Sequence, residues 1–331
     1  MRSITDAPPR AATARFERSF GQRFLLTVDT EEEFDWSEPL SRDRHGLDHV
    51  AQLARFQAFC ESESVVPVYL MDWPIARSSL AIDILRGAIA AGKAEIGVQL
   101  HPWVNPPFDE EVTPDNSFAG HLPRELERAK FRSLRDAIEA SFGVAPKIYR
   151  AGRYGVGPNS AAMLVEGGIA IDTSVRANFD YSEGSGPDFR HHPLFPYWLD
   201  EAKTLLELPL TTVFWGMLRK QGTWIFPALS RAPLLRSLLA RLGMLERIPL
   251  TPEGVTVEEA IRGIDIALDD GLPVLVLSFH SPSLEAGHTP YVRDEDDLDA
   301  LYDWWRRIFA YLEQRKVAPT TVAEILAAAR R

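Results

Sequence analysis

The chain has 331 residues, of which 45% are hydrophobic and 25% charged, a composition typical of a globular protein with a large core. The net charge of −11 disfavours nucleic acid as a partner, and the single cysteine, Cys60, excludes an intrachain disulfide framework. The sequence contains no run of about 18 apolar residues, so no membrane span is predicted. Because the N-terminus lacks the apolar region of a secretory signal, we expect residues 1–20 to form a flexible tail and the protein to be cytoplasmic.

Strand-like and helix-like segments alternate along the chain. Short apolar runs predict strands, and amphipathic segments bounded by Ser, Asp or Gly predict helices. The expected strands are 24–29, 65–70, 95–101, 147–155 (which ends in a glycine-rich turn), 169–174, 205–210 and 273–280. The expected helices are 48–64, 78–92, 122–143, 158–167, 256–271, 294–316 and 321–330. This order predicts a mostly parallel sheet with helical crossovers, forming one α/β barrel domain over residues 21–331.

Polar groups that can carry chemistry follow five of these strands. Asp29 and Glu31 end the first strand and point to the same side of an extended chain. The other four strand ends carry His101, Arg150, Asp172 and His280. Because the carboxyl ends of parallel strands meet at one edge of the sheet, we expect one site built from these ends. The alternatives are a solvated acidic turn at residues 31–33 and a structural role for each histidine.

The order of these motifs resembles the polysaccharide deacetylase (NodB-like) family of carbohydrate esterases. The likeness spans about residues 22–318. It rests on TVDTE (27–31), LHPWVN (100–105), YRAGRYG (149–155), IDTS (171–174) and LSFHSP (277–282). The segments DTEEEFDW and SFHSPSL look most similar to a WalW-like branch, which is found with bacterial surface-glycan genes.

The resemblance implies a distorted (β/α)7-type barrel that removes an N-acetyl group from a sugar with the help of a divalent metal. It implies that Asp29 is the general base, that Arg150 pairs with it, and that His280 protonates the leaving amine. One substrate must reach both Asp29 and His280, so we expect them within about 12 Å of each other. Asp172 is the candidate to orient His280, although the sequence leaves open which carboxylate does so.

The resemblance also implies that Glu31 and His101 bind the metal, but two positions depart from the family pattern. Thr30 stands where the family has an aspartate, which moves the metal carboxylate to Glu31. Asn105 stands where the family has a second histidine, and an amide oxygen is a poor zinc ligand. The expected cofactor is therefore zinc, or a harder ion such as manganese, magnesium or cobalt, unless metal binding has been lost.

Substrate contacts are expected from aromatic and basic residues that follow the strands, namely Trp73, Trp103, Arg153 and Tyr154. We also predict an insertion at about 211–250, whose charge differs from that of the rest of the chain. Residues 211–247 hold six basic residues and one acidic residue, leaving 30 of the 36 basic and 46 of the 47 acidic residues in the rest of the chain. This segment is either a helix packed on the barrel or a peripheral patch that meets anionic lipid or a lipid-linked glycan.

These observations leave three functions open. The first is a metal-dependent deacetylase of an N-acetylated sugar or lipid-linked glycan in surface-polysaccharide assembly. The second is a cytosolic amidohydrolase of a small amide or ureide, as some cytosolic relatives of the family are. The third is a non-catalytic carbohydrate-binding barrel, which the loss of a histidine at Asn105 motivates.

Overall fold

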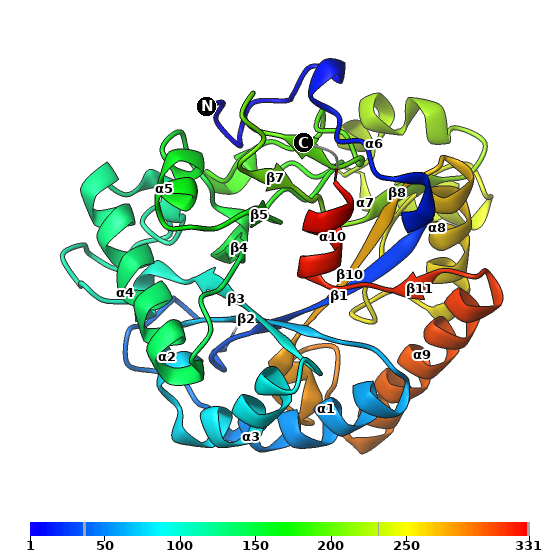
Figure 1. The fold of residues 1–331 in the computed structure, drawn as a ribbon. Coiled ribbons are helices and arrows are strands. Elements are labelled where there is room, and N and C mark those ends of the chain that lie inside the picture. The colour runs from blue at the N-terminus through cyan, green and yellow to red at the C-terminus, as the bar shows by residue number, and fades with distance from the viewer. Residues whose placement is uncertain (36–37, 231, 330–331) are drawn as a thin grey trace.

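The structure is a computed structural model that describes residues 1–35, 38–230 and 232–329 (Figure 1). In this described part of the chain, seven strands run parallel in one curled sheet, in the order β10–β1–β2–β3–β4–β5–β7. Their bounds are β1 Arg23–Thr30, β2 Val68–Met71, β3 Glu95–Leu100, β4 Ile148–Ala151, β5 Ile171–Asp172, β7 Leu206–Glu207 and β10 Val274–His280. This arrangement confirms the predicted distorted barrel.

Two further short strands pair with this sheet. β6 (Tyr197–Trp198) pairs antiparallel with β7, and β11 (Ala318–Pro319) pairs parallel with β1. The gap between β7 and β10 is crossed by the chain that follows β7. There the Leu210 amide donates to the Val175 carbonyl (2.9 Å), and the Val276 amide donates to the Thr211 hydroxyl (2.8 Å). These contacts nearly close the sheet into a barrel.

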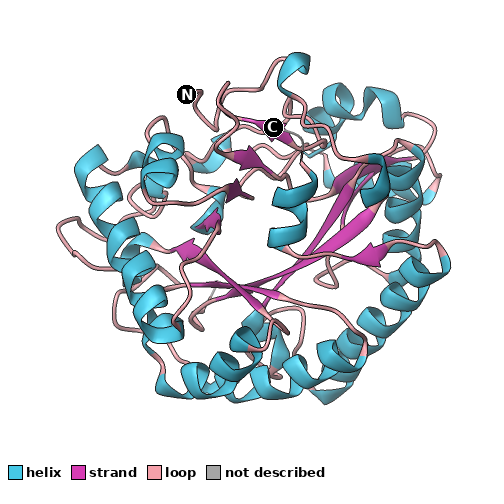
Figure 2. Ribbon diagram, viewed as in Figure 1, coloured by secondary structure: helices cyan, strands magenta, loops and turns pink. Residues whose placement is uncertain are grey.

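Helices cover the outer side of the sheet (Figure 2). The covering helices are α1 Leu53–Ser62, α2 Trp73–Arg77, α3 Ser79–Ala90, α4 Arg124–Phe142, α5 Ser160–Glu166, α8 Val257–Asp269 and α9 Glu295–Gln314. The Thr256 side chain caps α8 in a reciprocal pair with Glu259, and Gly143 ends α4 in the left-handed conformation (φ 75°). The predicted helices are therefore confirmed, with shorter ends.

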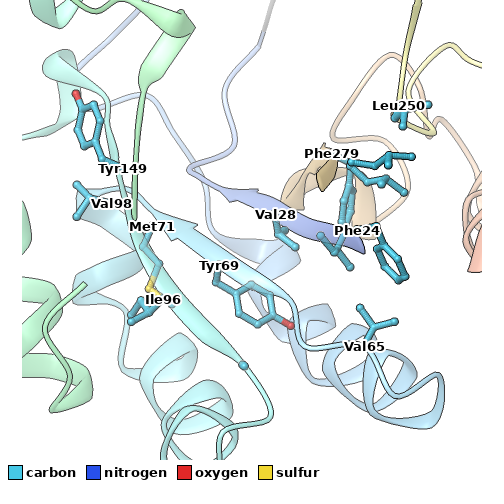
Figure 3. Packing of buried hydrophobic residues seen from close by; sticks show 14 of the residues in the cluster. Phe24, Val28, Val65, Tyr69, Met71, Ile96, Val98, Tyr149, Leu250 and Phe279 are labelled. Carbon is cyan, nitrogen blue, oxygen red and sulfur yellow. The ribbon is translucent and has the colours of Figure 1, made fainter. Parts of the chain in front are cut away.

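The core has two sides because side chains alternate along each strand. Phe24, Leu26 and Val28 of β1 point to the helices, where Figure 3 shows Phe24 and Val28 among the other buried residues of this layer. Leu25 points into the barrel and packs with strand residues and with α10 (Val322–Ala328), which lies within the ring of strands (Figure 1). Asp29 lies on the same face as Leu25, so the pleat aims it into the barrel at the end away from α10.

The N-terminal residues do not form the loose tail that we predicted. Ile4 is fully buried in the main core, and its carbonyl accepts a hydrogen bond from His192 (3.0 Å). The Ala14 amide donates to the Pro196 carbonyl (2.8 Å), and Phe16 forms a β-bridge with Ala329. Because Arg and small residues separate the few apolar residues of this stretch, the sequence did not predict that they pack against the barrel.

The insertion at about 211–250 forms a small unit of its own. β8 (Thr212–Trp215) and β9 (Glu246–Pro249) make an antiparallel hairpin, and α6 (Gly222–Ser230) and α7 (Pro233–Arg241) lie between them in sequence. The sequence predicted only the second helix. In the described ranges, no helix has the length and apolar character needed to cross a membrane.

Candidate active site

The carboxyl ends of the strands surround a cavity of about 780 Å³. The predicted chemical groups Asp29, Glu31, His101, Arg150 and His280 all line it. β1 and β10 are in register with Asp29 beside His280, and the Nε2 atom of His280 lies 3.8 Å from Oδ2 of Asp29. The expected proximity of these two side chains is therefore confirmed, since a single bound substrate can reach both.

Asp29 forms a buried ion pair with Arg150. The Nη1 atom of Arg150 donates to Oδ1 of Asp29. The rest of the guanidinium is fixed by Thr27 and Thr173, because Nη2 donates to the Thr27 hydroxyl (3.0 Å) and Nε to the Thr173 carbonyl (3.1 Å). Arg150 is fully buried, so breaking this ion pair would leave an uncompensated charge inside the protein.

Glu253 holds His280 from the side opposite Asp29. Its Oε2 atom lies 2.7 Å from Nδ1 of His280, and its Oε1 atom accepts from the His280 amide (3.2 Å) and the Ser283 hydroxyl (2.7 Å). Burial alone would lower the pKa of His280, but the negative charges of Glu253, Glu31 and Asp29 outweigh it and raise the pKa to about 10. The ring is therefore a cation at neutral pH and presents an Nε2 proton to the cavity.

Asp172 does not orient His280, contrary to our prediction. It is fully buried, does not line the cavity, and accepts from the Ser174 hydroxyl (2.7 Å). Burial raises the pKa of Asp172 and of Glu207, which are hydrogen-bonded to each other. Ser174 also accepts from the Ala151 amide (2.9 Å), so Asp172 supports the wall behind Arg150.

The candidate metal ligands Glu31 and His101 face each other across the cavity floor. Oε2 of Glu31 lies 3.5 Å from Nε2 of His101 and accepts from Nε2 of Gln99 (3.0 Å). Burial raises the pKa of Glu31 to about 8, although the charges of His280 and His101 act in the opposite direction. The Oε1 atom of Gln99 is buried and has no hydrogen-bond partner within the described residues. Three potential donor groups thus meet at this point.

A second acidic cluster lies behind His101. Glu32, Asp72 and His101 place three potential ligand atoms within 4.8 Å of one another, so among the described residues this buried triad could also hold a metal. However, Glu32 already accepts from Nε1 of Trp103 and lies 2.8 Å from Nδ1 of His101, while Asp72 accepts from the amides of Glu32 (2.7 Å) and Ile75 (2.9 Å). Neither carboxylate lines the cavity.

The arrangement at Glu32 instead fixes the chemistry of His101. The hydrogen bond between Nδ1 and Glu32 turns the Nε2 atom of His101 toward Glu31. Metal-binding histidines are commonly oriented by a carboxylate in this way. Burial raises the pKa of both Glu32 and Asp72.

The three glutamates at 31–33 are buried, so the solvated-turn alternative is wrong. Glu33 anchors a chain of hydrogen bonds that holds the backbone of Glu31. Its Oε1 atom lies 2.6 Å from Nδ1 of His49, whose Nε2 atom lies 2.8 Å from the Ser281 hydroxyl. That hydroxyl accepts from the Glu31 amide (3.2 Å). Ser281 is fully buried outside the cavity, so it positions Glu31 and does not attack a substrate.

Besides Asp172, two further predicted site residues lie outside the cavity. Asn105 is fully buried, and its Nδ2 atom donates to the carbonyls of Pro106 (2.7 Å) and Lys130 (2.9 Å). It stabilises the loop after β3 and does not face His101 across the cavity. Trp73 begins α2 and packs half-buried against the main core. The structure therefore removes both from the candidate ligands and substrate contacts.

The other predicted substrate contacts line the cavity. Trp103 stacks on His101 with ring centroids 4.4 Å apart. Arg153 and Tyr154 have left-handed backbones (φ 54° and 60°), which for these residue types is a strained conformation often seen at functional sites. Arg153 donates to the Ser117 hydroxyl and stacks over Phe118, with 4.3 Å from its Cζ atom to the ring centroid.

Comparison with solved structures agrees with this fold. The allantoinase Puue matches 93% of this chain over 89% of its own, with a TM-score of 0.50 and 13% identity. A GH57 branching enzyme from Thermococcus kodakaraensis matches 93% of this chain over 72% of its own, with a TM-score of 0.50 and 12% identity. A family 4 carbohydrate esterase from Streptomyces lividans covers 93% of this chain and 97% of its own, with a TM-score of 0.44 and 10% identity.

The two matches with a TM-score of 0.50 agree with the barrel fold that the strand order defines. Polysaccharide deacetylases and family 4 carbohydrate esterases are also among the structural neighbours. No family model and no curated protein matches the chain. The WalW-like branch thus stays a prediction from the motifs.

Proposed function

We propose that the protein hydrolyses a carbon–nitrogen amide bond and that its substrate is an N-acetylated sugar or lipid-linked glycan used in bacterial surface-polysaccharide synthesis in the cytoplasm. The observation that supports this most is one pair of side chains. The Asp29 carboxylate, which is paired with Arg150, lies 3.8 Å from the His280 imidazolium, which is paired with Glu253. Both side chains face one cavity. Such a pair supplies the base and the acid that amide hydrolysis requires.

The two groups act on opposite ends of the scissile bond. Asp29 takes a proton from water as the water oxygen attacks the acetyl carbonyl. His280 donates its Nε2 proton to the sugar nitrogen as the carbon–nitrogen bond breaks, which gives acetate and a free amine. Glu253 keeps a negative charge beside Nδ1, so His280 is recharged with a proton after each turnover.

The residues on the cavity floor fit a divalent metal. Glu31 and His101 would hold it, with the buried Oε1 atom of Gln99 as a third donor, since that oxygen otherwise lacks a partner in the described chain. When bound, the metal would polarise the acetyl carbonyl. Two oxygen donors and one imidazole suit manganese, cobalt or magnesium as well as zinc.

A test of the metal site compares two histidine substitutions in metal-stripped protein. We expect Gln99→His to raise zinc affinity at least about tenfold, because it places an imidazole beside Glu31 and His101. We expect Asn105→His to bring no gain and to lower the unfolding free energy by about 1–3 kcal/mol, because two buried carbonyls lose their donor. Competition with a chelating dye measures affinity without turnover. A gain in Asn105→His alone would place the ligand at Asn105 instead.

The proposed reaction is tested by acetate release from N-acetylglucosamine and its oligomers, with a series of divalent ions. A small amide or ureide substrate is the second candidate, favoured by the match to an allantoinase over 93% of this chain. Ureide hydrolysis without acetate release would select it. If the protein bound sugars but hydrolysed neither class with any ion, the carbohydrate-binding alternative would replace both.

A further inference from the structure

One wall of the cavity carries a half-buried cation that the reaction above does not use. Arg176, which follows β5, lines the cavity. Its Nη1 atom donates to the Tyr181 hydroxyl (3.2 Å), but its buried Nε atom has no hydrogen-bond partner among the described residues. A desolvated guanidinium with an unmet donor is costly unless a ligand completes it.

Aromatic rings hold this guanidinium in place. Its Cζ atom lies 4.0 Å from the ring centroid of Phe179 and 5.4 Å from that of Tyr154. Arg247 contacts the same Phe179 ring, with 3.5 Å from Cζ to the centroid. Burial and the positive charge of Arg176 lower the pKa of Arg247 to about 10. Two guanidinium groups therefore share one ring, and an anion beside them would offset their repulsion.

Arg176 is also close to the reacting groups. Asp29, His280 and Arg176 line the same cavity, as does Tyr154, whose ring centroid lies 5.4 Å from the Cζ atom of Arg176. An anion at Arg176 would thus share one cavity with the Asp29–His280 pair. This arrangement suits a charged group on the same sugar ring as the acetamido group, or on a neighbouring ring.

We propose that Arg176 binds an anionic group of the substrate, a phosphoryl or carboxylate group, and this rests on the hydrolase function proposed above. The guanidinium has a planar fork of donors that matches either group, and stacking on Phe179 fixes its orientation before binding. The substrate class is then an N-acetyl sugar that also carries a phosphate or an acid, and not a neutral glycan.

Calorimetric binding of three sugars tests this. The probes are N-acetylglucosamine 1-phosphate, N-acetylmuramic acid and neutral N-acetylglucosamine. We expect wild-type protein to bind one charged sugar about 10- to 100-fold more tightly than the neutral one, and the preferred charged sugar identifies the group. Arg176→Gln should remove this preference, Arg176→Lys should keep part of it, and Arg293→Gln, an exposed arginine outside the cavity, should keep all of it.

The outcomes separate this proposal from the hydrolase function. A preference for charged sugars that depends on Arg176, without acetate release, would retain the anion site and reject the hydrolase. Acetate release with no preference for charge would reject the anion site alone. Equal loss of charged and neutral binding in Arg176→Gln, or no binding of any of the three sugars to wild-type protein, would also overturn the proposal.

An independent observation concerns the outer face of the 211–247 segment. Met217, Trp224 and Leu234 are 80%, 77% and 90% exposed. Leu235, Leu238 and Leu242 are exposed as well, so this segment holds six of the eleven large exposed hydrophobic residues of the described chain. The segment has its own small core of Phe214, Phe226, Leu229 and Leu245. The outward residues are therefore not needed to hold it together.

We infer that this apolar face, defined by Met217, Trp224, Leu234, Leu235, Leu238 and Leu242, rests on an anionic lipid surface. Three exposed basic residues, Lys220, Arg236 and Arg241, accompany it. Apolar side chains beside cations are typical of segments that lie in a membrane interface. A second copy of the chain is a poorer occupant, because pairing through this face would bring its Lys220, Arg236 and Arg241 close to the same three cations of the first copy.

Vesicle co-sedimentation tests this face. We expect wild-type protein to bind vesicles containing phosphatidylglycerol, more weakly as salt rises, and to ignore pure phosphatidylcholine. Arg236→Gln and Arg241→Gln should each weaken binding about fivefold, Leu234→Ser with Leu242→Ser should abolish it, and Arg293→Gln should leave it unchanged. Wild-type protein that ignores anionic vesicles at low salt, or a dimer in solution that the two serine substitutions dissociate, would overturn the inference. Arg231 is also one of the six basic residues of the 211–247 segment, but it lies outside the described residues.

Discussion

Asp29→Asn is expected to reduce amide hydrolysis by about 10²–10⁴-fold, because it removes the group that accepts the proton of water. It should also lower the unfolding free energy by about 3–5 kcal/mol. The structure gives the reason for this second effect: Arg150 is fully buried, and the substitution leaves its charge without a counterion. Activity is measured as acetate release, and stability by urea unfolding.

A double substitution separates the two effects. Asp29→Asn with Arg150→Met replaces the buried cation by an apolar side chain of similar length, so part of the lost stability should return. Turnover should not return, since the base is still absent. Near wild-type turnover in Asp29→Asn would exclude Asp29 as the base. Turnover that recovers together with stability in the double variant would assign the loss to folding.

The strand-end groups could be predicted from the sequence because alternation along a strand is a local property. Asp29 follows Leu25 and Thr27 on one face of β1, and the same spacing aims Arg150 into the barrel after Ile148. Parallel pairing then brings these ends to one edge, which is a rule of topology and needs no knowledge of side-chain contacts. The fold and the Asp29–His280 pair follow from these two regularities.

Glu253 could not be found in this way. It lies in a loop after β9, where no periodicity marks it, and its role depends on contacts with residues 27 and 30 positions away in the chain. Asp172 was predicted in its place because it ends a strand. The strand-end rule says that a side chain lies near the site, but it does not say which partner that side chain meets.

Asn105 shows a limit of a different kind. Its position four residues after His101 predicts a ligand only if the backbone between the two residues follows the same path as in the polysaccharide deacetylase family. Here a turn at Pro102–Val104 intervenes, and the Asn105 amide meets the Lys130 carbonyl, 25 residues away. Gln99 instead occupies the position beside Glu31, because it lies two residues before His101 on the same face of the chain.

The second large effect is expected for Glu253→Gln, and it concerns pH. His280 must be protonated to donate to the leaving amine, and its pKa of about 10 keeps it protonated throughout the neutral range. Removing the Glu253 charge lowers this pKa, because the remaining negative charges then outweigh the effect of burial less completely. We therefore expect turnover near that of the wild type at pH 6 and a decline that begins at lower pH on the alkaline side.

The protonation of His280 should also make the unfolding free energy depend on pH. A histidine whose folded pKa is raised above the unfolded value of about 6.5 contributes stability that is complete below that value. This contribution is lost as pH rises through about 10 in the wild type. In Glu253→Gln the contribution is smaller, so unfolding free energy should vary less between pH 6 and pH 10. Urea unfolding across this range measures it without reference to any substrate.

Asp172→Asn is the matched control, because it removes a buried carboxylate that does not contact His280. We expect its alkaline limb of activity to coincide with that of the wild type. If Asp172→Asn moves this limb and Glu253→Gln does not, the carboxylate predicted from the strand end is the one that sets the charge of His280. If neither moves it, the alkaline limit belongs to another group, and His280 is not the acid that protonates the leaving amine.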